Sequence, residues 1–258
     1  MVEPPTESEK PLIVQFRDMM RDELDEERLS SDMYLLRWLR AREMNPQKAA
    51  LMLRTSMKWR QENKVDQVLH EIIDQDISDL IGGFFQAFDK FGRPVVALPG
   101  GEWDVRKPLD DGRKPELIRF LIMSLEIFEE TLKMIYKYGY PNQTPMIITK
   151  FTVIFDLKHF TYAKFAHKRS VEALLDLVKI YEANYPETLG RCLIINSPRI
   201  FSMLFAIVKP FLSENTVNKI SIFDSNEANW KKAVEEVIDP SQLPIRYGGR
   251  VENPALMD

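Results

Sequence analysis

The chain has 258 residues and few of the residue types that form covalent or metal-bound frameworks. Cys192 is the single cysteine, so no internal disulfide can form, which suits the cytoplasm. The three histidines, His70, His159 and His167, stand in no zinc-binding pattern, and no Cys-x-x-Cys pair exists. We therefore predict no metal site, and we expect His159 and His167 to be exposed surface residues.

The sequence also lacks a strong excess of either charge. Its formal net charge of -4 gives no sign of nucleic-acid binding, which requires a strongly basic face. A local basic patch for a membrane surface stays open, because the overall charge averages such a patch away. No nucleic-acid partner is expected.

No segment is long and apolar enough to span a membrane. The most apolar helical stretch, Ile200–Val208, has nine residues, whereas a membrane-spanning helix needs about 20. The N-terminus is acidic and proline-rich, unlike a signal peptide, and Val2 excludes the N-myristoylation pattern. We expect a cytoplasmic protein that meets membranes only at their surface and reversibly.

The common catalytic motifs are absent. The sequence has no Gly-x-Ser-x-Gly elbow, no Gly-x-x-x-x-Gly-Lys loop and no Gly-x-Gly-x-x-Gly after a strand. Cys192 lies in an apolar run that is typical of a buried strand, which favours an inert core thiol. We predict no catalytic residue and no cofactor. A pair of catalytic carboxylates stays a minor alternative, because carboxylates are plentiful.

The pattern of apolar residues divides the chain into two regions. In residues 1–80, Ser31 and Asn45-Pro46 are helix-start signals before apolar positions at helical spacing, which predicts a small bundle. After Gly82-Gly83, strands and helices alternate, which predicts a mostly parallel sheet over residues 81–250, followed by a tail at 251–258. The expected strands are 84–88, 94–98, 151–157, 191–196 and 219–223, and the expected helices are 116–136, 168–183, 198–211 and 227–237.

The segment Ile200–Val208 (IFSMLFAIV) is apolar on all sides except at Ser202. A helix of this kind is either buried in a core or faces something other than water. One interpretation is a core helix that packs on the sheet. The other is a lid with one face toward an apolar ligand, followed by a hinge at Lys209-Pro210, where proline removes a backbone hydrogen bond.

Seven segments in order along the chain resemble the CRAL-TRIO lipid-binding family. They are LLRWLRARE (35–43), FGRPV (91–95), FDLKHF (155–160), EANYPETLGR (182–191), INSPRIF (195–201), KPFLSENTVNKI (209–220) and LPIRYGG (243–249). The combination is similar in particular to the supernatant protein factor, or tocopherol-associated protein, subgroup, here without that subgroup's C-terminal GOLD domain.

The resemblance implies an α/β fold: an N-terminal helical bundle, then a mostly parallel sheet whose flanking helices enclose a hydrophobic lipid cavity. It implies a lipid-binding and intermembrane transfer protein and not an enzyme. The family's gate helix falls on Ile200–Leu212, and the residues expected to form it are Ile200, Phe201, Leu204, Phe205, Val208, Phe211 and Leu212.

The resemblance also implies a head-group site. Arg42, Glu187, Thr216 and Lys219 match positions that grip inositol phosphate in fungal members, where the cations suit a phosphate and the carboxylate suits hydroxyl donors. The alternatives are ordinary structural roles, with Arg42 paired to an acidic neighbour and Glu187 in a turn.

The expected choline cage is incomplete. Its two tyrosine positions are Phe85 and Val96, and of its two hydroxyl residues only Thr161 remains, since the other position is Ala163. Phe85, Val96 and Phe155 are therefore expected to line the cavity. The departures disfavour phosphatidylcholine, so phosphatidylinositol and an apolar lipid such as tocopherol, squalene or a retinoid both stay candidates.

A second function is compatible with the same resemblance, because the family also occurs inside regulatory proteins. The chain would then be a lipid-gated sensor that presents its lipid to an unknown protein partner. Transfer of lipid between membranes would be the distinguishing property of a carrier.

Overall fold

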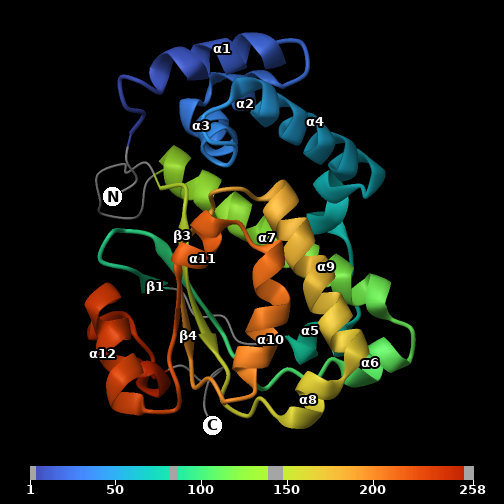
Figure 1. Ribbon diagram of the computed structural model, residues 1–258, viewed down its shortest axis with the longest axis vertical. Helices are drawn as coiled ribbons and strands as arrows, with labels where there is room; N and C mark the ends of the chain where they lie inside the picture. The colour runs from blue at the N-terminus through green and yellow to red at the C-terminus, as the bar shows by residue number, and fades with distance from the viewer. Residues whose placement is uncertain (1–3, 82–86, 139–147, 253–258) are drawn as a thin grey trace.

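The computed structural model describes residues 4–81, 87–138 and 148–252 (Figure 1). Its first part is helical. The helices are α1 (Lys10–Met20), α2 (Glu26–Ser30), α3 (Asp32–Arg40), α4 (Pro46–Glu62) and α5 (Gln75–Leu80), with the 3-10 helix η1 (Val65–His70) before α5.

Both predicted helix starts in this bundle are confirmed. The Ser31 hydroxyl accepts a hydrogen bond from the Tyr34 amide at 3.2 Å, and the Asn45 side chain accepts from the Lys48 amide at 2.9 Å. These caps satisfy amides that have no partner inside the helix. The apolar faces of α1, α3 and α4 then meet in one buried cluster that includes Phe16, Leu36 and Leu39. The bundle therefore has its own core.

The second part contains a five-stranded sheet in the order β1-β2-β3-β4-β5. Its strands are β1 (Ala87–Phe88), β2 (Pro94–Leu98), β3 (Phe151–Asp156), β4 (Leu189–Ile195) and β5 (Ile220–Ile222). β1 pairs antiparallel with β2, and every later pair is parallel. The predicted mostly parallel α/β fold is confirmed.

Helices lie on both faces of the sheet. They are α6 (Arg106–Asp110), α7 (Lys114–Tyr138), α8 (Tyr162–Ala166), α9 (Lys168–Asn184), α10 (Phe201–Val208), α11 (Glu214–Asn218) and α12 (Glu227–Val237), with the 3-10 helices η2 (Lys209–Phe211), η3 (Pro240–Gln242) and η4 (Ile245–Tyr247). None of the helices in the described part of the chain is both long and apolar enough to cross a membrane.

Side chains alternate between the two faces of each strand. Ala97, Ile154 and Leu193 point to the face covered by α12, where they pack with Trp230 and Val234 in a fully buried cluster. The opposite face looks toward α7, α9 and α10 (Figure 1). One face of the sheet is thus an ordinary core, and the other is the candidate ligand face.

A buried ion pair lies at the carboxyl end of the parallel sheet. Asp156, at the end of β3, accepts hydrogen bonds from Arg246 at 2.8 and 3.0 Å and from the Asn196 side chain at 2.8 Å. Asp156 is 1% exposed and the Arg246 side chain 8%. Ligand crevices in α/β proteins commonly open at this end, and here the ion pair occupies the end of β3.

The segment 198–211 is not one regular helix as predicted. It is α10 over Phe201–Val208, followed by the 3-10 turn η2 over Lys209–Phe211. Pro210 has no amide hydrogen and cannot continue the α-helical hydrogen-bond pattern. Lys209 keeps right-handed helical backbone angles, so the chain passes from α-helix to 3-10 helix at the proposed hinge without a sharp bend. The predicted strand 219–223 is three residues long, and residues 84–86 of the predicted first strand lie outside the described residues.

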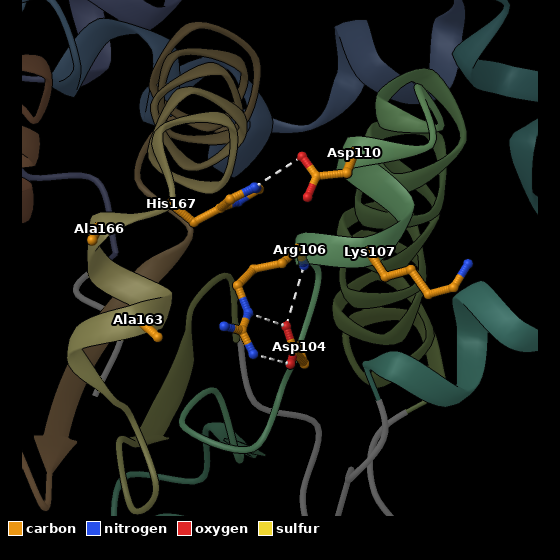
Figure 2. Close-up of a pocket in the computed structure, with 7 residues that line it drawn as sticks. All are labelled: Asp104, Arg106, Lys107, Asp110, Ala163, Ala166 and His167. Carbon is orange, nitrogen blue, oxygen red and sulfur yellow. Dashed lines mark hydrogen bonds and ion pairs between the residues drawn. The ribbon is translucent and has the colours of Figure 1, made fainter.

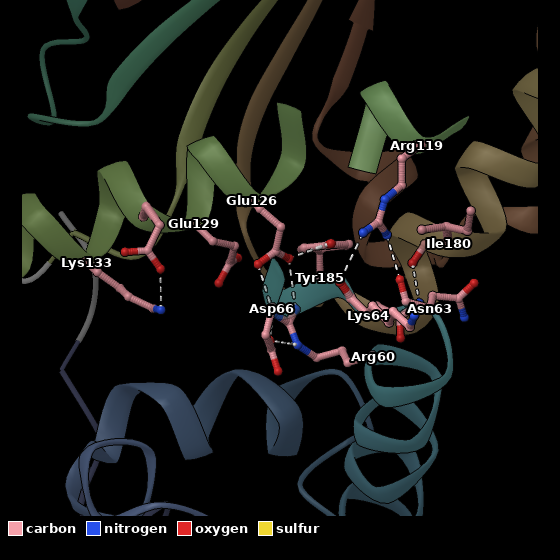
Figure 3. Close-up of polar contacts among 12 residues, drawn as sticks. Arg60, Asn63, Lys64, Asp66, Arg119, Glu126, Glu129, Lys133, Ile180 and Tyr185 are labelled. Carbon is pink, nitrogen blue, oxygen red and sulfur yellow. Dashed lines mark hydrogen bonds and ion pairs between the residues drawn. The ribbon is translucent and has the colours of Figure 1, made fainter. Parts of the chain in front are cut away.

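A buried polar network joins the bundle to the second part (Figure 3). Glu126 of α7 accepts two hydrogen bonds from Arg60 of α4, both at 2.8 Å, and a third from the Tyr185 hydroxyl at 2.6 Å. The Glu126 side chain is 8% exposed. Burial, and next the charge of Glu126, raise the pKa of the Tyr185 phenol, so Tyr185 is a neutral donor.

We expect Tyr185→Phe to lower the free energy of unfolding by about 1–3 kcal/mol, because a buried carboxylate oxygen loses a donor. Urea unfolding followed by circular dichroism measures the change. Tyr162→Phe is the control, because Tyr162 is 69% exposed and should leave stability unchanged. Equal stabilities for the two variants would contradict the role of the network.

Candidate functional site

The candidate ligand face of the sheet carries apolar side chains that keep accessible surface. Phe155, Cys192 and Ile220 belong to this face, and all three are only partly buried. Opposite them, α9 presents four apolar residues to the same cluster, and each of them also keeps accessible surface: Val171, Leu174, Leu175 and Val178. We call this partly exposed apolar surface under α10 the apolar hollow.

Cys192 is a thiol on this face of the sheet. It lies in β4, which has β3 on one side and β5 on the other. Burial raises the pKa of the Cys192 thiol to about 12, so protein surrounds the sulfur. The residue nevertheless retains accessible surface.

Helix α10 packs in the same apolar cluster and has two different faces. Phe201, Leu204 and Val208 are at most 8% exposed and pack in the apolar cluster with Leu157 and Ile194. Phe205 and Leu212 join the same cluster as partly buried residues, and Ile200 is the partly buried residue at the start of the helix.

The outer face of this segment is also apolar. Met203 is 56% exposed, and Ile207 and Phe211 are each 42% exposed. Their spacing of four residues places them along one side of the segment. The sequence left two interpretations open, a core helix and a lid, and the segment has features of both: an inner face in a core and an outer apolar stripe toward solvent.

A charged cluster lies at the amino end of the sheet. Lys219 donates to the Glu187 carboxylate at 3.2 Å and Lys150 to the same oxygen at 3.4 Å, while the Asn215 amide donates to the other oxygen. Lys150 directly precedes β3, Glu187 lies two residues before β4, and Lys219 directly precedes β5. Parallel strands thus bring the three charges together.

Electrostatics leave this cluster with an excess of positive charge. Two ammonium groups share one carboxylate, and all three side chains are at most 21% exposed. Burial, followed by the charge of Lys219, lowers the pKa of Lys150. Glu187 is buried too, but the two lysines outweigh that effect and lower its pKa, so it is ionised. A second anion near Lys150 would relieve the imbalance.

The structure brings together only some of the predicted head-group residues. Glu187 and Lys219 are in contact, and Thr216 lies one turn before Lys219 with its hydroxyl 2.8 Å from that of Ser213. The Arg42 guanidinium donates to the Ala41 carbonyl at 2.7 Å. Thr161 caps α8, beyond the carboxyl end of β3, and is therefore at the other end of the sheet.

The predicted cavity residues have different outcomes. Phe155 is partly buried in the apolar cluster, with its ring 5.9 Å from that of Trp103. Val96 alternates onto the same face of β2 but is only 7% exposed. Phe85 lies outside the described residues.

Lys150 was missed by the sequence analysis. Its only signal is its position directly before a buried strand, at the same end of the sheet as Glu187 and Lys219.

A separate open pocket of about 550 Å³ lies between α6 and α8 and contains His167 (Figure 2). The His167 side chain is 18% exposed, which corrects the expectation of an exposed histidine, while His159 is exposed. The His167 ring hydrogen-bonds to Asp110 at 3.1 Å and to Ser170 at 2.8 Å. His167 is the N-cap residue of α9, and Ser170 lies in the first turn of that helix. The contacts of Ser170, His167 and Asp110 therefore connect the start of α9 to α6. The prediction that the chain is not an enzyme stays a prediction.

The comparisons with known proteins identify the family. The CRAL/TRIO domain matches residues 80–249. The chain belongs to the CRAL/TRIO family. Family membership indicates lipid binding or transfer in general and names no particular lipid.

The relatives include Protein real-time from two insects. The protein of Aedes aegypti is 32% identical over 243 residues, which cover 92% of this chain and 36% of the relative. That of Drosophila melanogaster is 29% identical, covering 92% and 35%. The chain thus spans about a third of the length of these relatives.

A solved structure has the same fold. The crystal structure of Sfh5 matches with a TM-score of 0.70, covering 98% of this chain and 91% of that protein, at 15% sequence identity. This similarity extends over the bundle and the sheet together.

We expect the Cys192 thiol to react roughly a thousandfold more slowly at pH 8 with a thiol reagent such as iodoacetate than an exposed cysteine does, because the raised pKa leaves little thiolate. Mass spectrometry of timed samples gives the rate. The same protein unfolded in urea is the control and should react fast. Fast labelling of the folded protein would show that Cys192 is open to solvent.

Proposed function

We propose that this protein binds a hydrophobic lipid in the apolar hollow and transfers it between membranes, with Ile200–Leu212 as the mobile gate. The two-faced packing of α10 is the observation that carries this proposal. Its inner residues cover the hollow, and its outer residues Met203, Ile207 and Phe211 offer an apolar stripe to a bilayer.

The energetics explain why a carrier needs such a gate. Each CH₂ group removed from water contributes about 0.8 kcal/mol, so a two-chain lipid requires enclosure of surface worth more than roughly 20 kcal/mol. An enclosed lipid leaves only if part of the wall moves. In α10, the residues that cover the hollow and the residues that meet a membrane are on one helix, so movement of that helix couples the two events.

The charged cluster favours a lipid with an anionic, hydroxyl-rich head group. Lys150 and Lys219 supply the cations for a phosphate, and Glu187 and Asn215 supply partners for hydroxyls. Phosphatidylinositol is therefore our first candidate. A wholly apolar lipid such as tocopherol, squalene or a retinoid is the second, because most of the hollow is lined by aliphatic and aromatic side chains.

The subgroup remains a proposal from sequence motifs. The segments that resemble supernatant protein factor, or tocopherol-associated protein, favour that subgroup, and we retain it as a prediction. We also retain the prediction that the protein works in the cytoplasm, with reversible contact to membranes.

A second function is favoured by the length of the relatives. Because the match covers about a third of those proteins, a region similar to this chain also occurs within longer chains. It would then act as a lipid-gated sensor for a partner. A sensor binds lipid without delivering it, so vesicle-to-vesicle transfer of fluorescent lipid separates the two functions.

We expect the double variant Met203→Asp/Ile207→Asp to slow lipid transfer between vesicles by roughly tenfold or more, because it removes apolar contact with the bilayer. Both side chains are exposed, so thermal stability should not change. The assay follows dequenching of fluorescent phosphatidylinositol as it leaves donor vesicles.

Leu51→Asp is the matched control for this experiment. Leu51 is 67% exposed on α4, on the bundle and away from the gate. It should transfer lipid at the wild-type rate. Equal slowing in the control and in the gate variant would show a general effect of charge, and unaltered transfer in both would refute the gate.

We expect Lys219→Ala and Lys150→Ala to weaken binding of phosphatidylinositol by about tenfold to a hundredfold each, since each removes a charge-assisted hydrogen bond. Binding of tocopherol should not change, because it carries no anionic group. Displacement of a fluorescent lipid measures both affinities. Equal loss for the two ligands would contradict the head-group role.

A further inference from the structure

The stretch of chain around the gate carries no acidic residue. Between Glu187 and Glu214 there is neither an aspartate nor a glutamate, although 39 of the 258 residues are acidic. The same stretch contains three cations, Arg191, Arg199 and Lys209. It is therefore locally positive in a chain whose formal net charge is -4.

Two of these cations flank helix α10 directly. Arg199 lies two residues before the first residue of the helix, and Lys209 follows its last residue. Both are exposed, and within the described ranges neither has a carboxylate within 4.0 Å. Arg199 precedes Met203 by four residues, so it continues the outer apolar stripe one turn toward the amino end.

A third cation reaches the gate from α9. Lys179 is exposed, and its ammonium nitrogen lies 5.1 Å from the centre of the Phe211 ring. Such a cation–π contact holds the charge beside the most C-terminal residue of the apolar stripe. The outer face of the gate thus has cations at its start, at the end of α10 and at its side. We call Arg199, Lys209 and Lys179 the docking cations.

The acidic residues nearby do little to cancel this charge. Those of α9 that precede Lys179 are paired with lysines at 2.6 and 3.7 Å, Asp176 with Lys114 and Glu172 with Lys168. Glu182 is partly buried. Glu214 is exposed in the first turn of α11, beyond the apolar stripe, and offsets part of the positive charge. The exposed charge beside the stripe is therefore mainly positive.

Helix α8 brings a second positive stretch next to the amino end of α10 (Figure 1). Residues 157–171 contain no acidic residue, and Phe160 and Phe165 pack in the same apolar cluster as Phe201 of α10. Tyr162 is 69% exposed, with its ring 6.1 Å from that of Phe165. Exposed tyrosines suit the boundary between head groups and acyl chains, because one end of the side chain is apolar and the other polar.

A bilayer with anionic lipids matches both properties of this face. Apolar side chains of a surface helix enter the acyl region, while lysine and arginine extend their charged ends to the phosphates. A neutral bilayer would satisfy the apolar stripe only. An acidic protein would need an apolar groove shaped to this helix, whereas a bilayer needs no such shape.

We propose that the gate docks on anionic bilayers, with the docking cations at the lipid phosphates and the apolar stripe among the acyl chains. Docking in this form rests on the proposed function, in which the same helix meets a bilayer. It adds that the surface charge of a membrane decides where the gate inserts, so anionic membranes are the preferred donors and acceptors of the bound lipid.

Vesicle sedimentation tests the preference for charge. The full chain is mixed with vesicles of phosphatidylcholine alone or of phosphatidylcholine with phosphatidylglycerol, and the bound fraction is measured. We expect at least tenfold tighter binding to the anionic vesicles, and a smaller difference at high salt, which screens exposed charges. Equal affinity for the two kinds of vesicle would overturn the proposal.

Paired triple variants locate the surface. Lys179→Gln/Arg199→Gln/Lys209→Gln should weaken binding to the anionic vesicles by on the order of a hundredfold, since each cation near such a surface contributes severalfold. Binding to neutral vesicles should not change.

The control is Lys48→Gln/Lys232→Gln/Arg250→Gln, which alters the net charge by the same amount. Its three residues are exposed on α4, on α12 and after η4, away from the gate. It should bind anionic vesicles like the wild type. Equal weakening in both triple variants would show an effect of overall charge and refute the docking surface.

Two further readouts separate docking from lipid binding and transfer. Lys150→Ala and Lys219→Ala should dock like the wild type, because these lysines belong to the charged cluster at the amino end of the sheet. Preferential docking without any lipid transfer would support the surface and refute the carrier. Transfer without preferential docking would refute the surface alone, and binding to neither kind of vesicle would refute it in favour of a protein partner.

Discussion

The Glu126 carboxylate is a buried charge on which the arrangement of the molecule depends. Its partners come from distant parts of the chain: Arg60 from the bundle, and Tyr185 from the turn after α9. A buried carboxylate is tolerated only where donors satisfy it, so the three elements cannot separate without exposing or stranding the charge. The turn that contains Tyr185 continues directly to Glu187. Thr188 donates to the Tyr185 carbonyl at 2.9 Å and holds this turn in shape. The polar contacts of Glu126 therefore help to fix the position of the charged cluster relative to the bundle.

The two faces of the sheet show how one set of strands can support a core and a ligand space together. Residues that point toward α12 are buried with Trp230, whereas Phe155 and Cys192 on the opposite face keep accessible surface. Rigidity is supplied by the filled face. The hollow face is covered by α10, which ends in the 3-10 turn at Pro210. In the proposed carrier, the moving helix would thus be supported on a sheet that stays fixed.

The sequence alone predicted those features that depend on local pattern. The starts of α3 and α4 follow from Ser31 and Asn45 because a cap is a contact within one helical turn. The parallel sheet follows from strands and helices that alternate along the chain. Within the site, the apolar character of α10 was evident, but its two faces were not, since a helix that is apolar throughout has no moment to orient it.

Other features depend on contacts that no local pattern encodes. Lys150 is an isolated lysine whose role arises only when parallel pairing brings it beside Glu187. His167 becomes partly buried because Asp110, far away in sequence, packs against its ring. Arg42 and Thr161 were predicted by resemblance to a head-group site, yet neither contacts Glu187 among the described hydrogen bonds. Tertiary packing decides each of these cases.

The ion pair of Asp156 and Arg246 has a consequence for how specificity can change. This pair occupies a strand end where α/β proteins usually place binding loops. A ligand in the proposed site would therefore contact mainly strand faces and helix faces. Loops tolerate insertions, but a strand face changes only one side chain at a time, every second residue. Substitutions that adapt the protein to a new lipid would then change the volume of the site by one side chain at a time and leave its overall shape unchanged. Such a cavity suits ligands that differ in chain length or ring shape better than ligands that differ in overall architecture.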